Sequence, residues 1–168
     1  MLVSYYRLLG SAVIGVLLYL IFADLLRTKL GNVALIEEVL VHTNNQGLHD
    51  MTKPITDLVA SSGISEGLCT LFVQHTSASL LVQENYEVSA KRDLEVWLNR
   101  LVPENPEQYS HSSEGPDDMP AHIKSALTAT SVNIPILDGK LGLGTWQGIF
   151  LWEHRRSVHT RKVLVHLA

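Results

Sequence analysis

The sequence is poor in cysteine: Cys69 is the only one in 168 residues. A single cysteine excludes an internal disulfide, and it excludes a zinc site built from several thiolates. Because Cys69 lies within the apolar run 68–73, we expect it to be a small buried core residue and not a nucleophile.

The sequence also has few basic residues for its acidic content. Thirteen Lys and Arg stand against 17 Asp and Glu, which gives a formal net charge of −4. Residues 1–32 contain three basic residues and one acidic residue, so ten basic residues face sixteen acidic ones in the remainder, a formal charge of −6. A nucleic-acid-binding domain needs a basic surface, so we expect no nucleic-acid partner. The balance still permits a local basic pocket for a small phosphorylated substrate.

Uncharged apolar sequence is concentrated near the N-terminus, in residues 8–23. These 16 residues fall short of the roughly 20 that cross a bilayer, and the run reaches residue 26 only by including Asp24. Tyrosines and basic residues flank it, as they do at membrane interfaces. We therefore predict one N-terminal apolar helix that tethers the chain to a membrane through residues 8–26.

This segment divides the chain into an anchor with its flank, residues 1–32, and a single domain, residues 33–168. More positive charge follows the apolar run than precedes it, which favours a cytoplasmic location for the domain. A secretory signal peptide and a start-site artefact are the alternatives for residues 1–32.

Strand and helix patterns alternate from residue 33 onward. Helices are predicted at residues 52–61 and 87–101, with a short third helix that begins at Met119-Pro120. Thr52 and Asp118 are the expected N-caps of the first and third helices. Strands are predicted at residues 35–42, 68–74, 131–136, 149–154 and 161–167, with a hairpin turn at Asp138-Gly139 that returns through residues 140–141. This order predicts an α+β domain with a mixed, largely antiparallel sheet and a few helices.

Residues 109–122 (YSHSSEGPDDMPAH) hold a dense group of side chains that can bind a metal. The group consists of His111, Glu114, Asp117, Asp118 and His122. Imidazole and carboxylate groups are ligands for zinc, and carboxylates are ligands for magnesium. Because Pro120 suits the first turn of a helix, we expect His122 on a rigid helical turn. The alternative is a solvated acidic loop whose histidines have no role.

Two further segments are candidates for binding an anion. HTSAS at 75–79 follows a predicted strand with one histidine and three hydroxyl groups, and GLGTWQG at 142–148 contains three glycines that let the backbone approach a ligand. The glycine spacing excludes a dinucleotide fingerprint and a P-loop. Arg155, Arg156 and Arg161 form a basic group that can meet phosphate or pair with surface carboxylates.

Three strings in this order resemble one known family: HTSAS at 75–79, EGPDDMPAH at 114–122 and LGLGTWQGIFLWEHR at 141–155. They closely resemble the YjbQ family, also called UPF0047, over roughly residues 35–168. The resemblance implies an α+β sandwich that assembles as a homotrimer, and some members are described as secondary thiamine-phosphate synthases. Residues 1–32 are not part of the family's domain, so the resemblance does not determine localisation.

The resemblance also implies a pocket that holds a divalent metal, zinc or magnesium. The metal ligands are expected to be the residues that match the family's histidines: His75, His111 and His122. The candidate catalytic carboxylates are Glu114, Asp117, Asp118 and Glu153, and Asp117 or Asp118 is expected to bind the metal or to orient its ligands. His154 is not favoured, because relatives vary between Glu-His-Arg and Glu-Phe-Asp-Gly forms. Contacts to the substrate are expected from Thr76, Ser77, Gly144, Thr145, Trp146, Gln147 and Arg161.

Three functions are alternatives. The first is a transferase that resembles thiamine-phosphate synthase and joins an aminopyrimidine diphosphate to a thiazole phosphate with release of pyrophosphate. Because the leaving group is anionic and the domain is acidic, this reaction needs a divalent cation. The second is a metal-dependent hydrolase of a small phosphorylated substrate, with Glu114 or Glu153 as general base. The third is a non-enzymatic trimeric module that binds a metal or a ligand.

Overall fold

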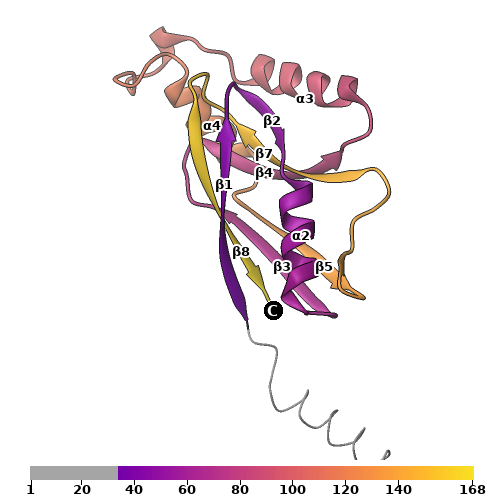
Figure 1. Ribbon diagram of the computed structural model, residues 1–168. Helices are drawn as coiled ribbons and strands as arrows, with labels where there is room; N and C mark the ends of the chain where they lie inside the picture. The colour runs from indigo at the N-terminus through magenta and orange to yellow at the C-terminus, as the bar shows by residue number, and fades with distance from the viewer. Residues whose placement is uncertain (1–33) are drawn as a thin grey trace, which may run out of the picture. The chain divides into compact units, whose positions relative to one another are not determined.

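Two antiparallel sheets share one hydrophobic core (Figure 1). The structure, a computed structural model, describes residues 34–168. The five-stranded sheet has the order β1-β8-β3-β5-β6, with bounds Leu35–Thr43, His159–Leu167, Gly67–Val73, Ser131–Leu137 and Lys140–Leu141. The three-stranded sheet has the order β2-β7-β4, with bounds Gly47–Asp50, Gln147–Glu153 and Ala78–Glu84.

Alternate side chains of the strands enter the core. In β3, Cys69 and Leu71 are buried whereas Leu68 and Phe72 are exposed, which is the two-residue period of a strand. The prediction that Cys69 is a core residue is confirmed. Its burial raises the pKa of the thiol to about 11, so the reactive thiolate is scarce at neutral pH.

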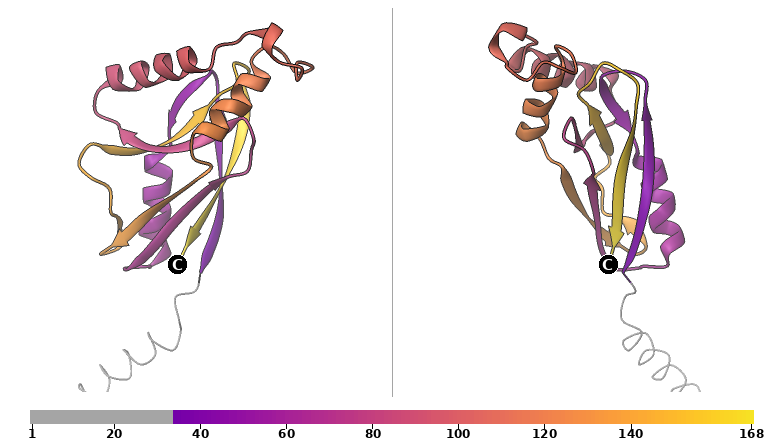
Figure 2. Two further views of the ribbon diagram at one scale, coloured as in Figure 1. Left: turned by 180° about the vertical axis from the view of Figure 1, so that it is seen from behind. Right: turned by 90° about the vertical axis from the view of Figure 1, so that its left-hand side faces the viewer.

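Three helices accompany the sheets: α2 at Thr52–Ser62, α3 at Val88–Leu101 and α4 at Asp118–Leu127. Helix α2 adds its apolar face to the core. Helix α3 contacts β2 and α4 contacts β4, which are the two edge strands of the smaller sheet. Both α3 and α4 lie at the end of the domain opposite the C-terminus (Figures 1 and 2).

The starts of two helices differ from the prediction by one residue. Thr52 is the first residue of α2 and not its N-cap, because Asp50 accepts a hydrogen bond from its N–H and its hydroxyl accepts one from Ile149. Asp118 is likewise the first residue of α4, and Asp117 precedes the helix without a capping hydrogen bond from its side chain. The carboxylate of Asp118 has another partner, described below.

The α+β class with antiparallel sheets is confirmed, as are the predicted strands and the hairpin turn at Asp138-Gly139. Two strands are not predicted by the sequence, β2 and β4. Strand β2 has only four residues, and the first two residues of β4 belong to the HTSAS motif. Within residues 34–168, no helix is long and apolar enough to span a membrane. The predicted anchor, residues 8–26, lies outside the described residues.

Candidate metal centre

The first turn of α4 brings Asp118 and His122 together. The two residues are four positions apart and therefore share one face of the helix, and Oδ1 of Asp118 lies 3.6 Å from Nε2 of His122. His111, in the loop before the helix, completes the group with its Nε2 atom 2.8 Å from Oδ2 of Asp118. One ligand atom of each residue lies within 4.8 Å of the other two, so the three can hold one metal ion.

A hydrogen bond determines which nitrogen of His122 is free. Its Nδ1 atom lies 3.0 Å from the carbonyl oxygen of Thr76. A carbonyl only accepts hydrogen bonds, so Nδ1 carries the proton and Nε2 of the neutral ring has a lone pair. Metal-binding histidines are commonly oriented by such a bond to a backbone carbonyl. Thr76 thus contributes to the centre through its backbone.

Asp118 is 2% exposed, yet its Oδ2 atom has no hydrogen-bond partner among the described residues. The other oxygen, Oδ1, accepts a hydrogen bond from the guanidinium of Arg155. His111 is near Oδ2, but its ring is not aligned to donate a hydrogen bond. An unpaired buried carboxylate oxygen is costly. This oxygen and the two imidazoles fit a cation, which would satisfy all three acceptors.

Arg155, two residues after the end of β7, holds the acidic loop in place. Its guanidinium contacts Oδ2 of Asp117 at 3.2 Å, and it reaches the carboxylate and carbonyl oxygens of Glu114 at 3.4 and 2.7 Å. Burial raises the pKa of Asp117, but hydrogen bonds from Arg156 N–H and from Arg155 outweigh this effect and lower the pKa. Asp117 is therefore an ionised anchor for Arg155, whereas the side chain of Glu114 is 70% exposed.

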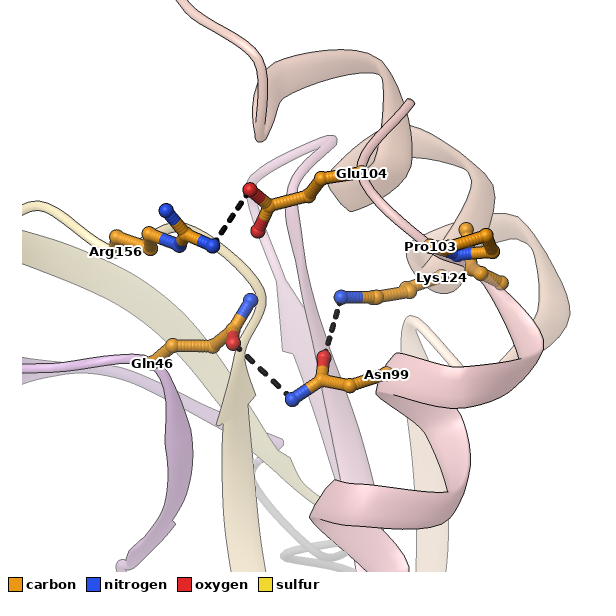
Figure 3. A pocket seen from close by; sticks show the side chains of 7 residues that line it. Gln46, Asn99, Pro103, Glu104, Lys124 and Arg156 are labelled. Carbon is orange, nitrogen blue, oxygen red and sulfur yellow. Dashed lines mark hydrogen bonds and ion pairs between the residues drawn. The ribbon is translucent and has the colours of Figure 1, made fainter. Parts of the chain in front are cut away.

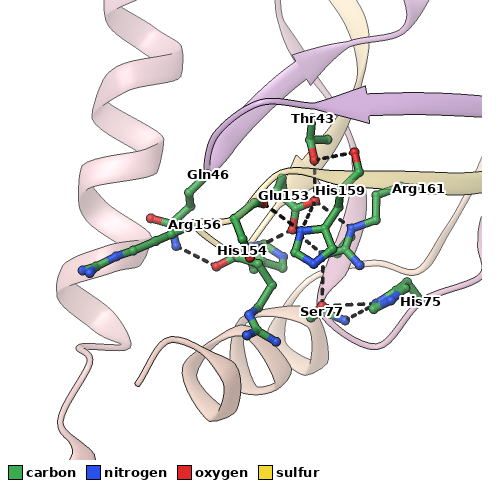
Figure 4. Close-up of polar contacts among 12 residues, drawn as sticks. Thr43, Gln46, His75, Ser77, Glu153, His154, Arg156, His159 and Arg161 are labelled. Carbon is green, nitrogen blue, oxygen red and sulfur yellow. Dashed lines mark hydrogen bonds and ion pairs between the residues drawn. The ribbon is translucent and has the colours of Figure 1, made fainter. Parts of the chain in front are cut away.

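Glu153 and Arg161 form a buried ion pair (Figure 4). The carboxylate of Glu153 accepts two hydrogen bonds from Arg161, one from the Thr43 hydroxyl at 2.9 Å and one from the Arg155 N–H at 3.0 Å. Burial raises the pKa of Glu153, but the hydrogen bonds from Arg161 outweigh it and lower the pKa. A carboxylate whose acceptor positions are all occupied is a poor general base, so this geometry argues against that predicted role.

Arg161 is likewise closed to a substrate. Its side chain is 1% exposed and also donates a hydrogen bond to the hydroxyl of Ser77 at 3.1 Å. Ser77 itself is 2% exposed. The predicted phosphate contacts from Arg161 and Ser77 are therefore not available in this arrangement, because both side chains are enclosed and already paired.

His75 is not among the three residues whose ligand atoms lie within 4.8 Å of one another, although it lies near enough to His122 for the two rings to interact electrostatically. Its Nδ1 atom accepts a hydrogen bond from the N–H of Ser77 at 3.2 Å and lies 3.1 Å from the Ser77 hydroxyl. Burial, followed by the charge of Arg161, lowers the pKa of His75. The structure therefore brings together two of the three predicted histidine ligands and adds Asp118 in place of the third.

The glycine-containing loop 142–148 lies at the opposite end of β7 from this centre. The strand runs from Gln147 to Glu153, and six residues of extended chain span about 20 Å. The loop is closed on itself, because Gln147 accepts a hydrogen bond from Gly144 N–H at 2.8 Å, and Trp146 packs edge to face on Tyr86. Within one chain, the predicted contacts Gly144, Thr145, Trp146 and Gln147 are thus not brought to the centre.

Residues 37–168 match the family described as "UPF0047 protein YjbQ-like". The chain belongs to the UPF0047 family. It is 53% identical to the UPF0047 protein of Synechocystis sp. over 132 residues, which cover 79% of this chain and 90% of that protein. It is 41% identical to the UPF0047 protein YjbQ of Escherichia coli O157:H7 over 124 residues, which cover 73% and 89% of the two chains.

Solved structures of this kind have the same fold. A yjbq/upf0047 family protein from Clostridium acetobutylicum aligns with a TM-score of 0.72 at 36% identity, covering 79% of this chain and 99% of that one. A conserved hypothetical protein from Thermus thermophilus aligns with a TM-score of 0.70 at 32% identity, covering 79% and 99%. These relatives establish the UPF0047 fold of the chain, and their names state no activity.

The role of Arg155 in this UPF0047 domain is not predicted by the sequence, where it is one of three neighbouring basic residues. A signal for it exists in β7, because residues 149–152 form a continuous apolar run and such runs belong to strands covered on both faces. Arg155, two residues past the end of this strand, is still buried and needs an opposite charge. The adjacent carboxylates of Asp117 and Asp118 supply it.

Proposed function

We propose that this UPF0047 chain is a zinc-dependent enzyme whose centre consists of His111, Asp118 and His122 and which acts on a small phosphorylated substrate. The observation that carries the proposal is the buried, unpaired Oδ2 atom of Asp118 beside two imidazoles. Two histidines and one carboxylate leave a coordination position open, as in catalytic zinc sites. His75 is not included, because among the described residues only His111, Asp118 and His122 have ligand atoms within 4.8 Å of one another.

The donor set supports zinc over magnesium. Magnesium prefers oxygen ligands in an octahedron and keeps several waters, whereas imidazole suits zinc and other transition metals. A bound zinc ion supplies a Lewis acid that withdraws charge from a phosphoryl oxygen or a leaving group. The same donor set occurs in non-haem Fe(II) sites, so iron is the metal to measure beside zinc.

The chain's own residues orient the centre and offer a base. Arg155 binds Oδ1 of Asp118, the oxygen nearest His122, and leaves Oδ2 facing His111. The carbonyl of Thr76 fixes the ring of His122. Glu114 is mostly exposed and is held only by a long 3.4 Å contact to Arg155. It is therefore the carboxylate of the loop best placed to take a proton from a substrate or from water.

The first reaction we propose is the transferase reaction implied by the family resemblance. The thiazole nitrogen forms a bond to the methylene carbon of the aminopyrimidine diphosphate, and the carbon–oxygen bond to pyrophosphate breaks with its electron pair on the leaving group. This reaction requires stabilisation of negative charge. The exposed Thr76 side chain beside His122 is the predicted substrate contact nearest to the centre.

A metal-dependent hydrolase is the second candidate. The exposure of Glu114 favours it, because a hydrolase needs a base that can reach a water molecule. The third alternative is a non-enzymatic module that binds the metal.

We also propose that the chain assembles as a homotrimer and that residues 8–26 attach it to a membrane with the domain in the cytoplasm. Exposed apolar side chains on the outer face of the five-stranded sheet, such as Ile36, Leu40 and Phe72, support association. In a trimer, residues 144–147 of one copy could also lie beside the metal centre of a neighbouring copy.

The full chain should be purified and its zinc, iron and magnesium content measured. Thiamine phosphate formation from the two precursors, and phosphate release from simple monoesters, should then be assayed with and without chelator. We expect about one zinc per chain, with metal and turnover both lost in Asp118→Asn and His122→Ala. The matched control His166→Ala, in β8, should retain both. Activity that survives chelation and both variants would refute the proposed centre, and stoichiometric metal without either turnover would favour the binding module.

A further inference from the structure

A pocket of about 230 Å³ opens where α3 ends, beside α4 (Figure 3). Its polar lining consists of Gln46, Asn99, Glu104, Lys124 and Arg156. The volume lies below the roughly 300–1,000 Å³ of pockets for drug-sized ligands. The pocket therefore suits a small molecule, or one charged group of a larger one.

Lys124 is a buried cation in the wall of this pocket. It is 2% exposed, and its ammonium donates one hydrogen bond, to Oδ1 of Asn99 at 2.6 Å. Within the described part of the chain it forms no ion pair with a carboxylate. An ammonium can donate three hydrogen bonds, and a buried charge without a counter-ion is costly. Accordingly, burial lowers the pKa of Lys124.

A chain of hydrogen bonds fixes the orientation of the two amides next to Lys124. Asn99 uses its oxygen to accept from Lys124, so its nitrogen donates to Oε1 of Gln46 at 3.3 Å. Gln46 then donates to the carbonyl oxygen of His154 at 2.7 Å. This series of hydrogen bonds thus ends at the backbone carbonyl of His154, and it gives Lys124 one uncharged acceptor, Oδ1 of Asn99. The remaining ammonium donors are left for a ligand.

Arg156 supplies a second cation on the other side of the pocket (Figure 3). Its side chain is 67% exposed and pairs with Glu104 at 2.7 Å. The guanidinium is mostly exposed, whereas the Glu104 side chain is only 17% exposed, so an oxyanion can approach the guanidinium from the solvent side and share it with Glu104. Two basic side chains and one carboxylate therefore line this pocket within an acidic domain.

We propose that this pocket binds the phosphate group of a small ligand between Lys124 and Arg156, at a site separate from the candidate metal centre. Helix geometry accounts for the separation. Lys124 follows His122 by two residues, so it lies about 200° further around α4 and faces another side of the helix. The phosphate site needs no metal and therefore stands independently of the proposed enzyme.

The test is calorimetric titration of the full, chelator-treated chain with inorganic phosphate and then with thiazole phosphate as a phosphate monoester. Removing one charged hydrogen-bond donor costs roughly 10- to 100-fold in affinity, so Lys124→Met should weaken binding by that factor. Arg156→Gln should weaken it less. Arg100→Gln, an exposed position on α3 outside the pocket, should leave it unchanged. A preference for the monoester identifies a ligand larger than phosphate itself.

Asn99→Asp separates ligand binding from a purely structural role of Lys124. It keeps the lysine and places a carboxylate where Asn99 now accepts a hydrogen bond, so an internal counter-ion replaces the external one. We expect this variant to fold and to lose phosphate binding. Affinity that is unchanged in Lys124→Met, binding that persists in Asn99→Asp, or no binding to the unaltered chain would overturn the proposal.

The metal centre is tested separately in the same titration. Phosphate that binds only in the presence of zinc, and is lost in Asp118→Asn, sits on the metal; this outcome overturns the pocket and leaves the proposed function standing. Phosphate that binds chelated Asp118→Asn protein supports the pocket even where the enzyme proposal fails.

Discussion

Oδ1 of Asp118 lies 3.6 Å from the Nε2 atom of His122. In the neutral ring both atoms are hydrogen-bond acceptors, because the carbonyl of Thr76 accepts a hydrogen bond from Nδ1. Two acceptors that point at each other repel unless a cation lies between them. The fold therefore maintains an arrangement that a metal ion would stabilise.

Zinc should accordingly stabilise the folded chain. A ligand that binds only the folded state adds about 2.7 kcal/mol at 100 times its dissociation constant. We expect the melting temperature of chelator-treated protein to rise with zinc, and the rise to disappear in Asp118→Asn. Asp138→Asn, in the exposed hairpin turn, is the control and should respond as the unaltered chain does. An equal rise in both variants would locate the zinc elsewhere.

Replacing Arg155 should destabilise the domain far more than replacing its neighbour Arg156. Arg155→Gln leaves the buried carboxylates of Asp117 and Asp118 without their counter-ion, and breaking a buried pair in this way costs about 3–5 kcal/mol. Arg156→Gln removes a pair with Glu104 in which the arginine is 67% exposed, so its loss should be smaller than that of Arg155→Gln. Urea unfolding measures both losses in chelated protein. Added zinc should restore part of the first loss, because it offers Asp118 another cation. Comparable losses in the two variants would contradict the role of Arg155.

His154 should make the domain less stable as the pH falls. The ring is 1% exposed, its Nε2 atom lies 2.9 Å from the hydroxyl of Ser79, and burial lowers its pKa to about 3. Below the ordinary histidine pKa of 6.5, the unfolded chain binds a proton that the folded chain does not. The contribution of His154 is therefore complete above pH 6.5 and declines by about 1.4 kcal/mol per pH unit until its folded pKa is reached.

The variant His154→Gln keeps a hydrogen-bonding group for Ser79 and removes the proton. The unfolding free energy is measured in urea at about pH 7, 6 and 5. As the pH falls, it should decrease less steeply in this variant, by about 1.4 kcal/mol per pH unit. His166→Gln should keep the slope of the unaltered chain. Identical slopes in His154→Gln and the unaltered chain would mean that His154 titrates normally in the fold.

The sequence predicts the elements of this domain better than it predicts the contacts between them. Regular periodicity marks α3 and the strands of the larger sheet, because each side chain there has one defined face. Strand β4 is not predicted, because Ser77 and Ser79 in the HTSAS motif are typical of turns. In the structure both serines are buried, where they bond to Arg161 and His154. Those partners lie more than 70 residues away, and no local pattern indicates them.

The same distinction between local elements and long-range contacts applies to the candidate metal centre. His122 and Asp118 are four residues apart on a predicted helix, so their proximity follows from the sequence once the helix is assigned. The assignment of Asp118 as an N-cap is wrong, because Arg155 binds its carboxylate more strongly than backbone N–H groups do. His75 is adjacent to Thr76 in sequence, yet it is Thr76 that contacts His122. Which residue of a turn faces the site depends on tertiary packing.

The pair Glu153 and Arg161 offers a test of whether a fully bonded carboxylate has a structural or a catalytic role. Glu153→Gln leaves the guanidinium of Arg161 buried without a counter-ion, and Arg161→Met leaves the carboxylate in that state, so each should cost about 3–5 kcal/mol. The double variant removes both charges and should cost less than the sum of the two single variants, because the two residues are in direct contact. Urea unfolding of the four proteins provides this comparison.

Zinc affinity then separates the two roles. A structural Glu153 predicts that the folded fraction of Glu153→Gln binds zinc as the unaltered chain does, and that it has the same turnover per folded molecule at low temperature. Turnover that falls beyond the loss of folded protein would make Glu153 a catalytic residue after all. Some of its four hydrogen bonds in the resting structure would then have to open during the reaction, and the two uncharged donors, the Thr43 hydroxyl and the Arg155 N–H, would leave more readily than the guanidinium of Arg161.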